Sequence, residues 1–180
     1  MEHKYELTDE TMNYGGHILH RIRRISDGKL GGWIESEENL SQDGNCWVDG
    51  EATVFGEAKI YGNAQVYGNA EISEHAQVYG NAKVYDDVWV YSGAEVYGNA
   101  QVYNDAKIGH SAKVYGNAKV YGRAEIVGFP QIYDNAEVFD DAYIHHHTII
   151  CGEAKIHGHA VIHGNIIISS DVYNEEINQE

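Results

Sequence analysis

The 180-residue chain contains a single proline, two cysteines and three phenylalanines, and its basic residues are few. No apolar run approaches the ~20 residues that a membrane-spanning helix needs. The opening residues, MEHKYELTDE, have neither the basic nor the apolar region of a signal peptide. We therefore expect a soluble, cytoplasmic protein.

The shortage of basic residues sets the charge of the surface. Lysine and arginine total 12 against 28 acidic residues, which gives a formal net charge of −16. Such a surface repels nucleic acid and anionic membranes, so we expect direct contact with neither. A macromolecular partner that binds through charge should present a basic protein surface.

Glycine and tyrosine, by contrast, are abundant, with 20 and 14 residues, and both recur at a period of six. An aliphatic residue occupies every sixth position from Val48 to Ile168, 21 positions without exception or insertion. A small residue, usually alanine, follows four residues after each. The sequence of a small residue, a variable residue and an aliphatic residue predicts a three-residue strand whose first and last side chains point inward. The residues between strands, typically Tyr-Gly-Asn, predict a tight turn, because glycine and asparagine tolerate positive φ.

Strands this short are stable only when their copies stack. The period, with an aliphatic residue first and alanine fifth, resembles the hexapeptide-repeat family, whose fold is a left-handed parallel β-helix with three repeats per triangular coil. The resemblance implies an all-β, single-stranded left-handed parallel β-helix of about seven coils over residues 47–173. The same count places Cys46 and Cys151 roughly 28 Å apart, which excludes a disulfide within the chain.

The N-terminal stretch is a separate signal. This stretch resembles the opening of YdcK-like proteins of enteric bacteria and phages, in which a short β-rich module leads into YGNA coils. The segments that carry the resemblance are YELTDE, HILHRIRRIS and GKLGGWIESEENLSQDGNCWV. We therefore expect residues 1–46 to form an N-terminal β-rich capping module. Residues 174–180 should form an acidic tail.

Taking the repeats in threes assigns their turns to three edges of the coil. We name the first the acidic edge, with turns 49–51, 67–69, 85–87, 103–105, 121–123, 139–141 and 157–159. Arg123 is its only strong base. We predict that its acids form a binding surface: Asp49, Glu51, Asp86, Asp87, Asp105, Asp140 and Asp141.

The tyrosine edge has turns 61–63, 79–81, 97–99, 115–117, 133–135, 151–153 and 169–171. Five tyrosines share one position in successive coils and should stack about 4.8 Å apart as an exposed ladder: Tyr61, Tyr79, Tyr97, Tyr115 and Tyr133. The ladder either braces the fold or forms a binding surface for another protein.

The histidine edge has turns 55–57, 73–75, 91–93, 109–111, 127–129, 145–147 and 163–165. It carries six histidines: His75, His110, His145, His146, His147 and His163. The histidine triplet is an ordinary turn, because the six-residue count continues through it to Ile150.

Three interpretations of the histidine edge stay open. The histidines are solvated turn residues; or His110 or His146 is a general base, the role that a turn histidine has in the acyltransferases of the resembled family; or His145 and His163, one coil apart, share a metal ion. We expect no catalytic and no metal site, with the other two interpretations as alternatives.

Two classes of function follow. In the first, the protein is a non-catalytic acidic β-solenoid binding protein. Seven acids over six coil steps give about one charge per 4 Å, close to the ~3.4 Å of a single DNA strand. This favours a nucleic-acid mimic that occupies the basic channel of a host or defence protein such as a CRISPR effector, and the resemblance adds a phage origin.

In the second class, the protein is a coenzyme A-dependent acyltransferase of the hexapeptide-repeat type. Those enzymes commonly have a long loop projecting from a coil, a C-terminal helix and a basic groove for cofactor phosphates, and the sequence shows none of these. We prefer the non-enzymatic class and expect no cofactor.

The last coils suggest self-association. Thr148, Ile166 and Val172 replace alanine there, and the tail YNEEINQE that follows is too polar to cover an apolar end. We expect a homo-oligomer that buries this end or the tyrosine edge.

Overall fold

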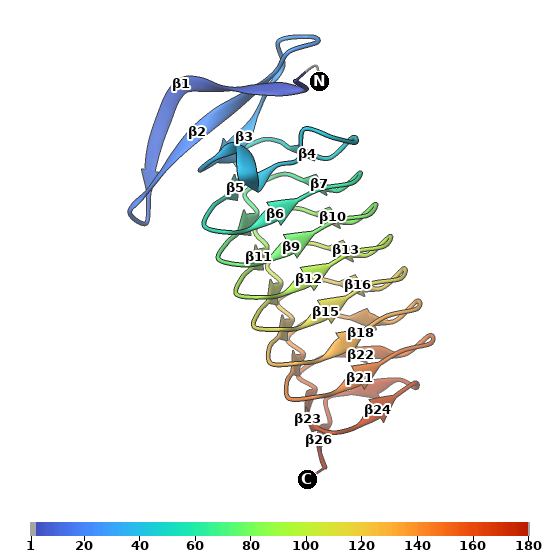
Figure 1. The fold of residues 1–180 in the computed structure, drawn as a ribbon. Coiled ribbons are helices and arrows are strands. Elements are labelled where there is room, and N and C mark those ends of the chain that lie inside the picture. The colour runs from blue at the N-terminus through green and yellow to red at the C-terminus, as the bar shows by residue number, and fades with distance from the viewer. Residues whose placement is uncertain (1–2, 180) are drawn as a thin grey trace.

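The structure, a computed structural model that describes residues 3–179, is a parallel β-solenoid with one sheet on each of three sides (Figure 1). The eleven-stranded sheet contains, in spatial order, β1 (Tyr5–Tyr14), β2 (His17–Arg24), β3 (Leu30–Ile34), β5 (Thr53–Val54), β8 (Glu71–Ile72), β11 (Trp89–Val90), β14 (Lys107–Ile108), β17 (Glu125–Ile126), β20 (Tyr143–Ile144), β23 (Val161–Gly164) and β26 (Glu176–Gln179).

The other two sides are built from short strands alone. The eight-stranded sheet contains β4 (Trp47–Val48), β7 (Gln65–Val66), β10 (Lys83–Val84), β13 (Gln101–Val102), β16 (Lys119–Val120), β19 (Glu137–Val138), β22 (Lys155–His157) and β25 (Val172–Tyr173). The seven-stranded sheet contains β6 (Lys59–Ile60), β9 (Gln77–Val78), β12 (Glu95–Val96), β15 (Lys113–Val114), β18 (Gln131–Ile132), β21 (Ile149–Ile150) and β24 (Ile167–Ile168).

The coil register follows the six-residue period. Each strand pairs in parallel with the strand one coil later, as Val84 does with Val102. All 21 aliphatic positions lie in the core, none more than 5% exposed. The predicted β-solenoid is confirmed, although most strands contain two residues instead of three. The inward alanine lies outside the strand, but its carbonyl still accepts an amide from the previous coil, as from Gln65 N to Ala82 O at 2.9 Å.

The solenoid begins earlier than residue 47. β3 pairs antiparallel with β2 on one side and parallel with β5 on the other, so that Ile34 lies beside Val54. Leu40 likewise bridges to Ile60. These steps are 20 residues long because two extra residues lie between Leu40 and Val48, where the 18-residue step begins, and the turn after β3 contains the short 3-10 helix η1 (Glu37–Asn39). The expected capping module therefore contains the first coil, and the eight strands of the second sheet mark about eight turns.

The hairpin of β1 and β2 covers the open end of that first coil (Figure 1). Tyr5, Leu19 and Ile22 are completely buried. The hydroxyl of Tyr5 donates a hydrogen bond to the carbonyl of Leu40 at 2.6 Å. Because an uncovered coil would expose unpaired strand groups, this contact closes the N-terminal end.

The C-terminal residues differ from the expected acidic tail. β25 pairs with β22, and β26 pairs in parallel with β23, placing Ile177 beside Ile162. Ile177 packs against the core. The periods here are 16 and 15 residues, shorter than the regular 18, so the hexad count does not reveal these strands. No helix among residues 3–179 is long and apolar enough to cross a membrane.

Candidate binding edges and histidine cluster

In every repeat turn except 169–171, the second residue has a positive φ. Glycine occupies most of these positions, but Asp86, Asp140 and His146 have φ of 63°, 59° and 63°. Neighbouring turns pack closely, since a Cβ added at Gly98 would lie 3.0 Å from the amide nitrogen of Gly116. The side chain at this position therefore lies next to the backbone of the following coil.

The N-terminal cap uses part of the acidic edge. Asp49 forms an ion pair with Lys29 at 2.5 Å. Glu51 accepts hydrogen bonds from Arg21 at 2.9 Å and from the indole of Trp33 at 3.1 Å, and these bonds lower the pKa of its carboxyl group. The structure thus assigns these two acids to fastening the hairpin onto the first coils.

Further along the edge, several carboxylates contact the next coil. Asp86 accepts a hydrogen bond from the backbone amide of Asn104 at 3.1 Å, and Asp140 accepts one from that of Gly158 at 3.0 Å. Asp141 pairs with Arg123 at 2.7 Å. These three carboxylates therefore help to hold neighbouring coils together.

Asp87 and Asp105 are the more accessible acids of this edge. Both are exposed. Asp87 accepts a hydrogen bond from the side chain of Asn69 at 2.9 Å, which leaves its charge intact. Among residues 3–179, neither carboxylate has an ion-pair partner. They are the clearest free negative charges among the seven predicted binding residues.

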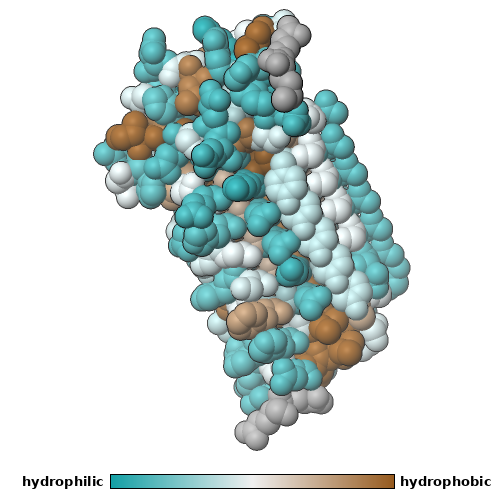
Figure 2. Space-filling model, in the orientation of Figure 1, coloured by the Kyte–Doolittle hydropathy of each residue, from teal (hydrophilic) through white to brown (hydrophobic). Residues whose placement is uncertain are grey.

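The tyrosine edge carries the predicted ladder. Neighbouring rings of Tyr61, Tyr79, Tyr97, Tyr115 and Tyr133 lie 4.7 to 5.0 Å apart and within 15° of parallel. Figure 2 shows them as a continuous column of stacked rings. The rings are partly buried and not fully exposed as expected. Burial, followed by a hydrogen bond to Glu95, raises the pKa of Tyr79 far above its ordinary value.

An amide ladder runs beside these rings. Five asparagine side chains each donate to the asparagine of the next coil at 3.0 to 3.2 Å, and the last, Asn135, donates to Glu153 at 2.6 Å; the donors of the five are Asn45, Asn63, Asn81, Asn99 and Asn117. Ladders of this type stabilise stacked strands because every side-chain bond repeats with the backbone ladder. Much of this edge is accordingly used to hold neighbouring coils together.

A second aromatic column lies on the acidic edge, and sequence reasoning missed it. Its stacked members are Tyr67, Tyr85, Tyr103, Tyr121, Phe139 and His157, at 4.8 to 5.1 Å. The signal was present, because an aromatic residue opens six successive turns of that edge. The acidic edge therefore pairs carboxylates with aromatic rings.

The six histidines of the third edge fall into different environments. His75 lies 3.1 Å from Glu57. His110 makes an edge-to-face contact with Tyr91, with centroids 6.1 Å apart. His147 stacks on Phe129 at 4.7 Å. These three are individual turn residues.

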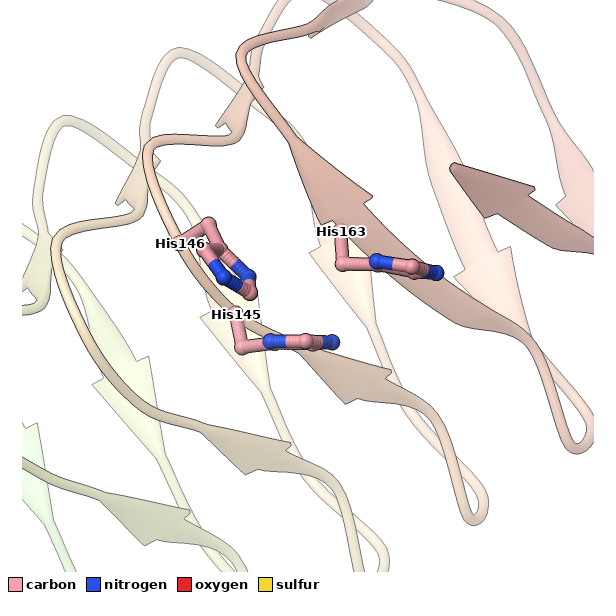
Figure 3. Close-up of side chains that lie close together, drawn as sticks. All are labelled: His145, His146 and His163. Carbon is pink, nitrogen blue, oxygen red and sulfur yellow. The ribbon is translucent and has the colours of Figure 1, made fainter. Parts of the chain in front are cut away.

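The remaining three form a cluster, drawn in Figure 3. His145 stacks on His163 with ring centroids 4.9 Å apart, and His146 lies 4.4 Å from His145 at a tilt of 47°. One ring nitrogen from each lies within 4.8 Å of the others. Burial, and then the charges of His146 and His163, lower the pKa of His145. The adjacency of His145 and His163 matches the predicted column, whereas the position of His146 is new.

The two candidate general bases, His110 and His146, line one open hollow of about 270 Å³ together with Val127, Gly128 and Phe129. Within the described part of the chain, no carboxylate lies within hydrogen-bonding distance of either imidazole. A general base is normally oriented by such a partner, so this arrangement lacks a feature that the acyltransferase interpretation needs.

Comparison with known proteins agrees with the repeat. A family profile described as the YdcK beta solenoid repeat matches residues 76–92, from the coil that contains β9 to the strand β11. The chain therefore contains a β-solenoid repeat of the YdcK type, as the sequence resemblance suggested. A search of curated proteins gave no match.

Proposed function

We propose that the protein is a non-catalytic binding protein whose acidic edge binds the basic surface of another protein. One observation carries the proposal: Asp86, Asp87 and Asp105 occupy adjacent turns and have no cationic partner among the described residues. The overall charge of −16 supports it, because a strongly acidic surface attracts basic partners over a distance.

The carboxylates without a Lys or Arg partner are spaced in a way that suits a nucleic-acid mimic. Asp86, Asp87, Asp105 and Asp140 lack a Lys or Arg partner in the described chain and span three coil steps, about 14 Å. That is about one charge per 4 Å, near the ~3.4 Å spacing of a single nucleic-acid strand. The finer form of the proposal is a phage-encoded mimic that occupies the basic nucleic-acid channel of a host or defence protein such as a CRISPR effector.

The aromatic column of the same edge adds a second mode of recognition. Tyr85 and Tyr103 stack 5.1 Å apart in the coils that carry Asp86, Asp87 and Asp105. Arginine binds carboxylates through its fork of donors and also stacks on aromatic rings. An arginine-rich surface therefore fits this edge better than a lysine-rich one.

Competition with nucleic acid tests the proposal. A labelled single-stranded DNA bound to a purified CRISPR effector should be displaced by the wild-type protein, with displacement weakening steeply as salt rises. The Asp87→Lys/Asp105→Lys variant should displace it at least tenfold less well. The matched control, Asp9→Lys/Glu10→Lys, makes the same charge change at exposed positions of β1 and should behave like the wild type. Equal losses in both variants would show that only net charge matters.

The shared hollow of His110 and His146 favours acyl transfer as the second candidate. Its test is acyl transfer from a coenzyme A thioester to amine and hydroxyl acceptors. Turnover that disappears in His110→Ala or His146→Gly but survives Asp87→Lys/Asp105→Lys would replace the binding proposal with an enzymatic one.

A further inference from the structure

The histidine cluster differs from the other aromatic stacks of the solenoid in chemistry. Stacks at the same spacing elsewhere pair tyrosine with tyrosine, tyrosine with phenylalanine, or phenylalanine with histidine, such as Phe139 with His157 at 4.8 Å. Ring stacking alone therefore does not require two histidines at positions 145 and 163. What the imidazoles add is nitrogen lone pairs, which are good ligands for divalent transition metals.

His146 gives the second argument, because it has no ring partner in its own column. Its neighbours one coil before and one coil after are Gly128 and Gly164, which have no side chains. The ring of His146 lies instead beside those of His145 and His163, with centroids 4.4 and 6.1 Å away (Figure 3). Three imidazoles from two turns thus gather at one place.

We propose that His145, His146 and His163 form a binding site for a divalent transition-metal ion of the zinc class. Their ligand nitrogens lie within 4.8 Å of one another. A tetrahedral zinc ion with bonds of ~2.0–2.1 Å requires nitrogens roughly 3.3 Å apart. The parallel rings must therefore tilt toward each other by about 1.5 Å in total, which rotation about their side-chain bonds supplies.

The surroundings of the cluster fit a metal site. The Nε2 atom of His163 lies 3.7 Å from a carboxylate oxygen of Glu176, on the terminal strand β26. This distance is too long for a hydrogen bond, so the carboxylate would orient the imidazole and raise its basicity, with the other nitrogen on the metal, once the two groups move closer. The cluster is reached from solvent, because His146 is exposed. A fourth coordination position is thus open to water.

The residue beneath the cluster also departs from the repeat. Thr148 replaces the usual alanine and is completely buried. Its hydroxyl oxygen lies 2.9 Å from the carbonyl of His145 and 3.4 Å from that of Gly164. This side chain ties together the two turns that supply all three histidines, and fixed turns hold ligands at a defined separation.

Zinc titration of the untagged protein tests the site. Calorimetry should show one zinc ion bound per chain, and cobalt should give the visible absorption bands of a tetrahedral complex. His145→Phe should preserve the ring stack and the fold while weakening zinc binding at least tenfold. His146→Gly should also weaken it, and glycine suits the left-handed backbone there. Glu176→Gln should weaken binding about tenfold if the carboxylate orients His163.

The matched control is His147→Ala, which removes a histidine of the same turn that stacks on Phe129 outside the cluster. It should leave zinc binding unchanged. Zinc should raise the melting temperature of the wild type and of the control but not that of His145→Phe. The proposal fails if the wild type binds no zinc, or if the control loses as much affinity as His145→Phe.

Discussion

Asp140 offers the sharpest test of how the turns are stabilised. Its backbone is left-handed, with φ of 59°, and its carboxylate accepts the amide hydrogen of Gly158 at 3.0 Å. Aspartate tolerates this conformation better than alanine does, by about 1 kcal/mol. The hydrogen bond adds about 1–2 kcal/mol, at the low end for a charged acceptor because the side chain is exposed.

Replacing Asp140 by alanine should therefore cost about 2–3 kcal/mol of unfolding free energy. Asp140→Gly should cost only about 1–2 kcal/mol, because glycine removes the hydrogen bond but not the conformational preference. Asp140→Asn keeps an acceptor oxygen and should cost less than either. The expected fall in melting temperature for the alanine variant is roughly 4–12 °C in a chain of this size.

Urea unfolding followed by circular dichroism measures these differences. Asp105→Ala is the matched control, because Asp105 lies on the same edge at the third turn position, outside the residues with positive φ. It should change stability by no more than about 0.5 kcal/mol. Equal costs for the alanine and glycine variants at position 140 would refute the conformational part of the argument. A loss in the control equal to that of Asp140→Ala would refute the rest.

Three more predictions concern the hairpin, the tyrosine ladder and assembly. Hydrogen bonds from His17 and then from the Gly56 amide lower the pKa of Glu35 below its ordinary 4.5. The stabilisation that ionised Glu35 provides is therefore present above pH 4.5 and is lost as the pH falls through the lowered pKa. The difference in melting temperature between wild type and Glu35→Ala should shrink below about pH 4. Tyr97 stacks on Tyr79 and Tyr115 at 4.8 and 4.9 Å, so Tyr97→Ala should cost about 1–3 kcal/mol in urea unfolding, whereas Tyr97→Phe, which keeps both stacks, should cost almost nothing. Ile167 is 69% exposed at the C-terminal end, and we expect a homo-oligomer in light scattering that Ile167→Asp dissociates; a monomeric wild type would contradict this.

The repeat was predictable because one period governs the whole coil. Counting in sixes placed the 21 inward aliphatic residues from Val48 to Ile168, and counting in eighteens placed the three edges and the contact of His145 with His163. Both ends escaped this count for a physical reason. The first coil has 20-residue steps because two extra residues lie between Leu40 and Val48, and the last has steps of 16 and 15 residues, so a fixed period cannot find the strands β3, β25 and β26.

Side-chain partners were less predictable than the register. Lys29 and Arg21, which neutralise Asp49 and Glu51, lie outside the repeat and reach the acidic edge only through the folding of the hairpin. The approach of His146 to His145 depends on the left-handed backbone of one turn and on the glycines in the neighbouring coils. The 18-residue count predicts which residues lie above one another in successive coils, but it predicts neither contacts with the hairpin nor the direction of a turn side chain.

Residues that depart from the repeat consensus indicate where a coil has a role beyond packing on its neighbours. Alanine at the fifth repeat position needs only to fill the corner, and any other residue there must have a local reason. At Thr148 the reason is visible, because its hydroxyl lies within 2.9 Å of the carbonyl of His145 and 3.4 Å of that of Gly164. The one hydroxyl at an alanine position thus lies directly beneath the histidine cluster. Since stacking alone would be satisfied by alanine, the coincidence favours two turns built to hold the three imidazoles in place.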